Sequence, residues 1–221
     1  MKQANNNRLY RILEWIMWMM YLNILWIGGW ILGLGILGFF PATMATVVTI
    51  REWREGDGDL SFTKTFFRAW KKHFIKANVF GYFYLLIGFI LYIDYFWLLN
   101  LESSFASVLF VLFILLVVLY VVSLLYLFPV YAHFDTGFFQ TIRHAIILGF
   151  FSPIMTILMG ICLALIAFTW LKIQGLIVVV GVSVPLYFVT SLALTAFHSF
   201  KEKQDLLVEN ESLKKGGKSN A

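Results

Sequence analysis

Long stretches without a charged side chain divide this chain into segments of membrane-crossing length. Residues 15–50, 103–132, 145–171 and 173–197 contain no Asp, Glu, Lys or Arg, and residues 77–101 contain only Asp94. About 20 apolar residues are enough for an α-helix to cross the hydrocarbon of a bilayer. Apolar and polar positions do not alternate with a period of two, as they would in a membrane β-barrel. The pattern therefore predicts an all-α fold, a polytopic transmembrane helical bundle.

The first of these stretches is too long for one crossing and barely long enough for two. Its glycines and Pro41 offer places to break a helix. The positive-inside rule separates the alternatives, because cytoplasmic loops carry most Lys and Arg. With two crossings, 16 of the 17 Lys and Arg fall on one side, and with one crossing 13 do. We therefore predict six helices with both termini cytoplasmic, and keep five helices plus a re-entrant segment as the alternative.

The expected domain organisation follows from these boundaries. Residues 1–200 form a helical transmembrane domain, and residues 201–221 form a polar, disordered cytoplasmic tail of alternating charge. An amphipathic helix over residues 61–76 lies in the membrane interface between the second and third crossings. The six crossings are expected over residues 9–27, 30–50, 77–99, 105–131, 145–170 and 175–199.

The composition agrees with a membrane location. Hydrophobic residues make up 61% of the 221 positions and charged residues 13%, whereas a soluble domain is about half apolar and a quarter charged. The net charge of +5 comes from basic residues that flank the apolar stretches, which indicates contact with the lipid bilayer and not with nucleic acid. The single cysteine, Cys162, lies among apolar residues and by itself can form neither an internal disulfide nor a metal cluster.

The segment 61–76 combines an aromatic row with a cationic row. At 100° per residue the two rows lie on opposite faces of a helix that Ser61 can cap. Such a helix suits the headgroup region of an anionic leaflet. We interpret it first as a membrane anchor, and second as a surface that docks anionic lipid headgroups or a partner protein. The candidate docking residues are Phe62, Phe66 and Trp70 in the aromatic row and Lys64, Arg68, Lys72 and Lys76 in the cationic row.

Glycines in the apolar stretches indicate close packing of helices. Residues 33–38 match the dinucleotide-binding pattern GxGxxG, but they lie inside an apolar stretch, where a pyrophosphate would lose its hydration. We therefore expect no cofactor there. Small residues on one helix face let neighbouring backbones approach closely. The candidate packing residues are Gly29 and Gly33 in the first stretch and Gly81 and Gly88 in the third crossing.

Few polar residues in the apolar stretches could carry chemistry. Asp94 is the first candidate for a ligand- or proton-binding residue, although a place near the outer interface also fits an interfacial acid. Asn23 is the second candidate, with an interhelical hydrogen bond as the favoured alternative. The set His133, Asp135 and His144 has weak metal-ligand spacing and no fourth ligand. We predict no catalytic residues, no cofactor and no metal site, and we do not expect an enzyme.

The chain contains the segments 23–26 (NILW), 38–45 (GFFPATMA), 51–53 (REW), 66–74 (FFRAWKKHF), 76–78 (KAN) and 128–135 (FPVYAHFD), together with Pro153. These segments resemble the YesL family of bacterial multi-spanning membrane proteins. The resemblance covers about residues 8–200 and implies a multi-pass protein of the plasma membrane of Gram-positive bacteria. Family members are often encoded near carbohydrate uptake and degradation systems, and no established activity or catalytic residue carries over.

The expected function combines this resemblance with the character of the helices. Kinked, glycine-rich helices with few charges fit a transporter-like or accessory protein, and the family resemblance connects it with carbohydrate uptake. The alternative is a signalling or assembly partner of another membrane protein. Such a partner would bind through small-residue helix faces and through the segment 61–76.

Overall fold

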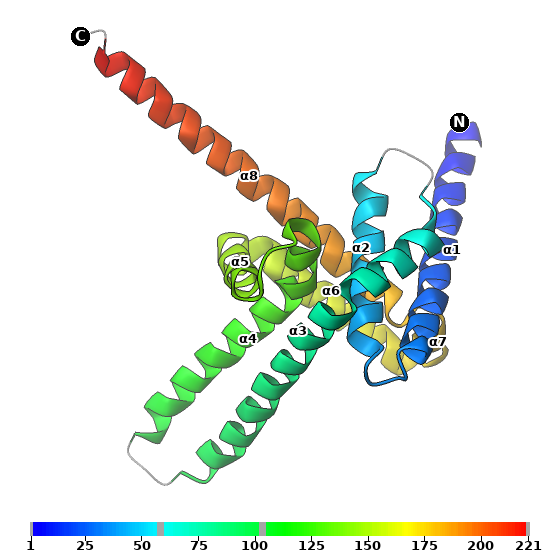
Figure 1. Cartoon of the computed structure of the whole chain (residues 1–221), viewed down its shortest axis with the longest axis horizontal. Helices are drawn as coiled ribbons and strands as arrows, with labels where there is room; N and C mark the ends of the chain where they lie inside the picture. Colours follow the sequence, from blue (N-terminus) through cyan, green and yellow to red (C-terminus); the bar gives the residue numbers. More distant parts are fainter. Residues whose placement is uncertain (1, 57–59, 102–104, 220–221) are drawn as a thin grey trace.

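Eight α-helices and no β-strand make up the part of the chain that the structure describes (Figure 1). The structure is a computed structural model that describes residues 2–56, 60–101 and 105–219, with side chains over 8–56, 60–101 and 105–203. The all-α prediction is therefore confirmed. The helices are α1 (Lys2–Leu32), α2 (Phe39–Glu55), α3 (Phe62–Leu99), α4 (Ala106–Phe134), α5 (Phe138–Phe151), α6 (Pro153–Lys172), α7 (Gly175–Val180) and α8 (Ser183–Ser219).

Five of these helices contain segments long and apolar enough to cross a membrane. Each segment contains a long apolar stretch, and about 20 apolar residues match the thickness of a bilayer core. They agree with the prediction of a multi-pass helical membrane protein. The segments are Arg8–Leu32, Phe62–Leu99, Ala106–Phe134, Pro153–Lys172 and Ser183–Lys203.

Helix α2 is shorter, with 17 residues, and lies at the centre of the bundle. It packs against α1, α3, α4 and α8, and every residue from Pro41 to Ile50 is buried. Thr43, Thr46 and Thr49 donate their hydroxyls to backbone carbonyls four residues earlier, so these buried polar groups are satisfied within the helix. The middle of α2 is therefore surrounded by the other helices, so it needs no apolar face for contact with lipid.

The turn between α1 and α2 accounts for the glycines of the first apolar stretch. Leu34 and Gly35 have φ values of 57° and 72°, in the left-handed region that glycine adopts at no steric cost. A Cβ on Gly33 would lie 2.2 Å from the Cα of Gly38. The segment that matches GxGxxG thus closes a tight connection between two antiparallel helices. The sequence predicts Gly33 as a residue of helix–helix packing, and in the structure Gly33 lies in this turn against Gly38.

Several helix boundaries differ from the expected ones. The segment 61–76 and the crossing 77–99 form one continuous helix, α3, because no Gly or Pro separates them. The crossing 145–170 is divided at Ser152, and Pro153 begins α6, where its missing N–H costs nothing. The crossing 175–199 is broken between α7 and α8 at residues 181–182. Residues 201–219, expected to be disordered, continue α8 to Ser219.

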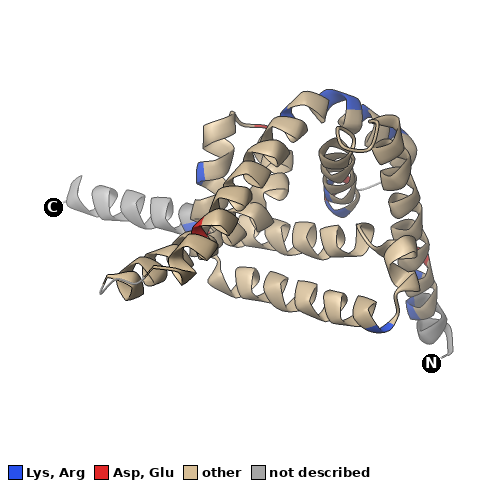
Figure 2. Cartoon of the chain, turned by 90° about the horizontal axis from the view of Figure 1, so that it is seen from below, with Lys and Arg blue, Asp and Glu red and all other residues tan. Residues whose placement is uncertain are grey.

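Two groups of buried apolar residues hold the bundle together. One joins α1, α2, the first half of α3 and the end of α4, and the other joins α4, α5, α6 and α8. The second half of α3 and the first half of α4 extend away from both groups as a two-helix hairpin (Figure 1). Most of their large apolar side chains are exposed, as expected of surfaces that face lipid. Figure 2 shows that long stretches of the ribbon carry no charged residue.

The chain reverses direction at two ends of the bundle. In Figure 1 the turn between α1 and α2, the end of α3, the start of α4 and α7 lie in the lower half of the view, and the start of α1 and the end of α8 lie in the upper half. We call the end that holds residues 51–55, residues 62–76 and Asp135 the polar end. The opposite end, with the turn 33–38, is called the turn end. The charged residues that contact one another lie at the polar end.

Candidate functional site

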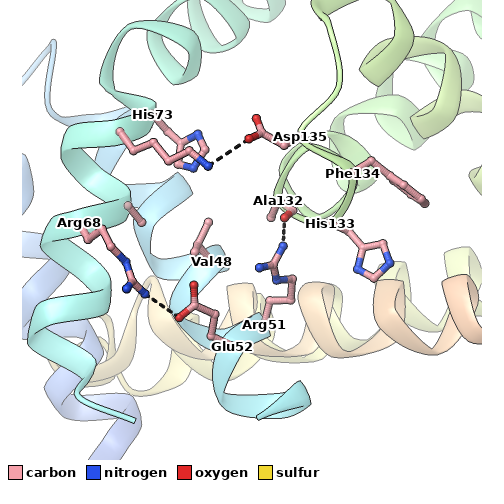
Figure 3. Close-up of a pocket in the computed structure, with 11 residues that line it drawn as sticks. Val48, Arg51, Glu52, Arg68, His73, Ala132, His133, Phe134 and Asp135 are labelled. Atoms are coloured by element: carbon pink, nitrogen blue, oxygen red, sulfur yellow. Dashed lines mark hydrogen bonds and ion pairs between the residues drawn. The ribbon is translucent and has the colours of Figure 1, made fainter.

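A cavity of about 340 Å³ opens at the polar end between α2, α3 and the end of α4 (Figure 3). Its walls carry charged side chains of both signs. We call this cavity the ionic pocket. It is lined by Val48, Arg51 and Glu52 of α2, by Arg68, Ala69, Lys72 and His73 of α3, and by residues 132–135 at the end of α4.

Arg51 connects the last turn of α2 to the last turn of α4. Its guanidinium Nη1 donates to the backbone carbonyl of Ala132 (Figure 3), and its Nε lies 3.6 Å from Oε2 of Glu55. The last carbonyls of a helix have no partner within the helix. A cationic donor is favourable there because the carbonyl end of a helix carries partial negative charge. Arg51 therefore fixes the end of α4 against α2.

The cationic row of α3 faces two acids from other elements. Nη2 of Arg68 donates to Oε2 of Glu52 at 3.0 Å. One turn further along α3, Nζ of Lys72 donates to Oδ2 of Asp135 at 3.0 Å, and Nζ of Lys76 lies 3.7 Å from Oδ1 of the same carboxylate. Residues spaced by four share one helix face, so the row predicted from the sequence reaches both α2 and the end of α4.

Asp135 follows α4 in an uncommon backbone conformation. Its φ is 43° and its ψ is 41°, the left-handed region, and its N–H donates to the carbonyl of Tyr131 at 3.0 Å. Asp and Asn visit this region more readily than most residues. The hydrogen bond from Lys72 is the main cause that lowers the pKa of Asp135 below its ordinary value. The carboxylate is thus held charged at the mouth of the ionic pocket.

Two histidines line the pocket with separate partners. Nδ1 of His73, on α3, lies 3.0 Å from the hydroxyl of Tyr131, and the His73 side chain is buried. Nδ1 of His133 lies 3.6 Å from Oε1 of Glu55. Among the described residues no three or more His, Cys, Asp or Glu side chains come together as a metal site would require. The arrangement therefore offers hydrogen bonds and charges, and no metal-binding cluster.

A second, more apolar cavity of about 460 Å³ adjoins the ionic pocket. The two share His133 and Phe134 in their walls. The other walls come from α5 and α8. They are Leu148, Phe197, His198, Phe200 and Lys201.

The aromatic row of α3 has a different neighbour from the one expected. Phe62 and Phe66 are buried in the chain's own core, and the ring of Trp18 on α1 stacks on Phe62 at 4.1 Å between centroids. Trp70 is partly buried, and Lys64 is exposed. Phe62 and Phe66 therefore pack against α1 and α2 inside the protein, where burial removes their rings from water.

The two polar candidates of the apolar stretches lie apart from the ionic pocket. Asn23 is buried, and its side chain bonds to the backbone of Val178 and Val182. Asp94 is exposed on the outer half of α3. Within the described residues it makes no ion pair, so the structure brings no partner to it.

The four candidate packing glycines have close neighbours. A Cβ on Gly29 would lie 3.0 Å from the ring of Phe66, and one on Gly88 would lie 2.7 Å from the hydroxyl of Tyr120. A Cβ on Gly81 would lie 2.1 Å from the ring of Phe40. Gly33 meets Gly38 in the turn described above.

Sequence reasoning did not identify Arg51, Glu52 and His73 as parts of one site. Arg51 and Glu52 directly follow the first apolar stretch, and His73 falls between the two rows of α3. One signal in the sequence points to this site: charged residues closely follow the apolar stretches that end at residues 50 and 132. It indicates polar helix ends, and it does not indicate which ends meet.

Comparisons with known proteins agree with the resemblance to the YesL family. Residues 19–95 match the family described as "Protein of unknown function, DUF624". The uncharacterized protein YteU of Bacillus subtilis (strain 168) is 37% identical over 58% of this chain, which spans 57% of YteU. The uncharacterized proteins YesL and YesV of the same organism are 28% and 27% identical over 90% and 92% of this chain, and over 94% and 97% of their own lengths. No solved structure matches the chain.

Proposed function

We propose that this chain, a member of a YesL-like family of unknown function, crosses the bacterial plasma membrane six times and has both termini in the cytoplasm. Five crossings would be the long apolar helices, and α2 would be the sixth. The proposal is supported by the short turn that makes α2 antiparallel to α1. It is also supported by the placement of Arg51, Arg68, Lys72 and Lys76 at one end, since cytoplasmic ends collect Lys and Arg.

We further propose that the protein is a non-enzymatic accessory of a carbohydrate uptake system and not a carrier by itself. The observation that supports this is the distribution of ionic groups: the ion pairs of the described residues gather at the polar end. A route for a polar solute needs polar lining along the depth of the membrane. Asn23, deeper in the bundle, uses its amide on backbone groups. The connection with carbohydrate uptake rests on the family resemblance.

The second candidate is a signalling or assembly partner of another membrane protein. The α3–α4 hairpin favours it, because the hairpin extends from the bundle with most of its large apolar side chains exposed. Small residues such as Gly88 within α3 would allow a partner helix to approach. However, Gly88 already lies against Tyr120 of α4, so a partner helix would have to bind the outward faces of the hairpin.

Reconstitution and crosslinked co-purification test these proposals together. The purified full chain in liposomes is expected to move no labelled oligosaccharide. Co-purification after crosslinking in cells grown on oligosaccharides is expected to recover a membrane subunit of a carbohydrate permease. Oligosaccharide transport by the chain alone would overturn the accessory role. Recovery of a sensor or assembly protein, with no permease subunit, would replace it with the second candidate.

A further inference from the structure

The ionic pocket contains more hydrogen-bond donors than its own acids use. A guanidinium carries five N–H donors and an ammonium three. Arg68 directs one nitrogen to Glu52, and Lys72 shares the single carboxylate of Asp135 with Lys76. Most donors of Arg68 and Lys72 therefore bond to no described residue, and both side chains line the cavity.

The charges that line the pocket leave a positive surplus. Among the lining residues, Arg51, Arg68 and Lys72 stand against Glu52 and Asp135. Outside the lining, Lys76 lies within ion-pair distance of Asp135 and Glu55 lies within ion-pair distance of Arg51, so these two further charges offset each other. The donors come from two walls, since Arg51 lies on α2 and the other two cations lie on α3 (Figure 3). A surplus of cations with forked and rotatable donors suits an anion with several acceptor oxygens.

The surroundings of the pocket fit a ligand that is polar at one end. The pocket lies at the polar end, next to the apolar cavity with which it shares Phe134 and His133. That neighbouring cavity carries Lys201 on its wall as well. A phosphate ester of a hydrophobic alcohol could place its phosphate in the first cavity and its apolar part in the second. A metal ion fits less well, because Glu52 and Asp135 are each already paired with a cation.

We propose that the ionic pocket binds a phosphate group, held by Arg68 and Lys72 on α3 and by Arg51 on α2. Two sources can supply that group: the headgroup of an anionic phospholipid, or a water-soluble phosphate. The donors and charges that recognise it are the same for both. This proposal does not depend on the accessory role, since a phosphate site could serve any membrane protein.

The test uses the full chain, purified in a neutral detergent and a buffer free of phosphate. Three probes are titrated against it by calorimetry: inorganic phosphate, a short-chain phosphatidylglycerol, and the matching diacylglycerol that lacks phosphate. We expect binding of at least one phosphate-bearing probe and none of the diacylglycerol. Binding of inorganic phosphate assigns the site to a water-soluble phosphate. Binding of phosphatidylglycerol alone assigns it to a lipid headgroup.

Four variants decide whether the binding occurs in the ionic pocket. Arg68→Gln and Lys72→Gln are each expected to weaken binding at least about tenfold, since each removes a charge-assisted bond. Lys71→Gln and Lys172→Gln make the same charge change on exposed residues that do not line the pocket, and they are expected to bind like the wild type. The first pair must elute as the wild type does in size-exclusion chromatography.

A steric variant keeps the test valid if either neutralised variant fails to fold. Ala69 lines the pocket and is buried, so Ala69→Leu should fill the cavity without changing a charge. It is expected to lose the binding of the phosphate-bearing probe. Absence of binding by both phosphate probes overturns the proposal. So does an equal loss in Lys71→Gln and Arg68→Gln, because this would indicate attraction by net charge alone.

Discussion

The backbone N–H of Val182 donates a hydrogen bond of 3.1 Å to the side-chain oxygen of Asn23, across the break between α7 and α8. The amide nitrogen of the same asparagine donates to the carbonyl of Val178 at 2.8 Å. A break inside a bundle leaves backbone groups that no helical partner satisfies, and in lipid these groups are costly. One side chain of α1 therefore supplies both a donor and an acceptor to the broken last crossing.

Replacing Asn23 should destabilise the protein strongly. Asn23→Leu leaves the N–H of Val182 and the carbonyl of Val178 unpaired, at a cost of about 1–3 kcal/mol for each group. The midpoint of thermal unfolding in detergent, followed by circular dichroism, is the measurement. Asn100→Leu is the matched control, because the side chain of Asn100 donates to the carbonyl of Phe96 within its own helix, at the exposed end of α3. Equal midpoints for the two variants would remove the role assigned to Asn23.

The contact between Gly81 and Phe40 predicts opposite signs for two glycine substitutions. Gly81→Ala forces α3 away from α2, because its Cβ would lie 2.1 Å from the Phe40 ring, and overpacking of this kind costs about 1–3 kcal/mol. Gly160→Ala in α6 meets nothing within 4 Å and should raise stability by up to about 1 kcal/mol, through helix propensity. Both are measured as changes in the thermal midpoint.

A second substitution tests the assignment of that clash. Phe40→Ala removes the ring, so the clash with the new methyl group disappears in the double variant. The destabilisation of Phe40→Ala combined with Gly81→Ala should therefore be smaller than the sum of the two single destabilisations. Additive effects would mean that the ring and the glycine do not interact in the folded protein.

The sequence predicts the helical architecture well because the bilayer imposes one simple requirement. The apolar stretches that begin near residues 77, 103 and 145 correspond to α3, α4 and the α5–α6 pair, since about 20 apolar residues make a crossing whatever they pack against. The breaks at Ser152 and at residues 181–182 depend on local packing. Asn23 supports the second break from 159 positions away, and no local pattern reveals that partner.

The ionic pocket could be predicted only in part, for a physical reason. The period of four in residues 62–76 correctly separates an aromatic face from a cationic face. An aromatic face looks the same in sequence whether it meets lipid or protein, so the burial of Phe66 against the core did not follow. The ion pair between Lys72 and Asp135 joins residues 63 positions apart, and its formation depends on how α3 and α4 pack.

The ion pair of Asp135 predicts a loss of stability in acid. Its pKa is lowered, chiefly by the hydrogen bond from Lys72, so its contribution is fully present above the ordinary carboxyl value of about 3.9. That contribution is lost as the pH falls through the lowered pKa of the folded protein. The difference in thermal midpoint between wild type and Asp135→Asn should therefore be largest near neutral pH and shrink below about pH 4.

Asparagine is the suitable replacement because it tolerates the left-handed backbone at this position, so only the charge changes. Asp94→Asn serves as the control, since Asp94 makes no ion pair with a described residue. A pH dependence as large for Asp94→Asn as for Asp135→Asn would show that the acid effect belongs to net charge and not to this pair.

The proposed six-crossing topology predicts which residues a membrane-impermeant maleimide can reach. In a Cys162→Ser background, Leu34→Cys lies at the turn end, where Leu34 is 85% exposed, and it should react in intact cells. Tyr10→Cys and Lys71→Cys, both exposed, should react only after the cells are permeabilised. Tyr10 separates the two interpretations of the first apolar stretch. If that stretch crosses once, the start of α1 is outside and Tyr10→Cys reacts in intact cells, whereas Lys71→Cys stays protected in both arrangements and reports that the membrane is sealed.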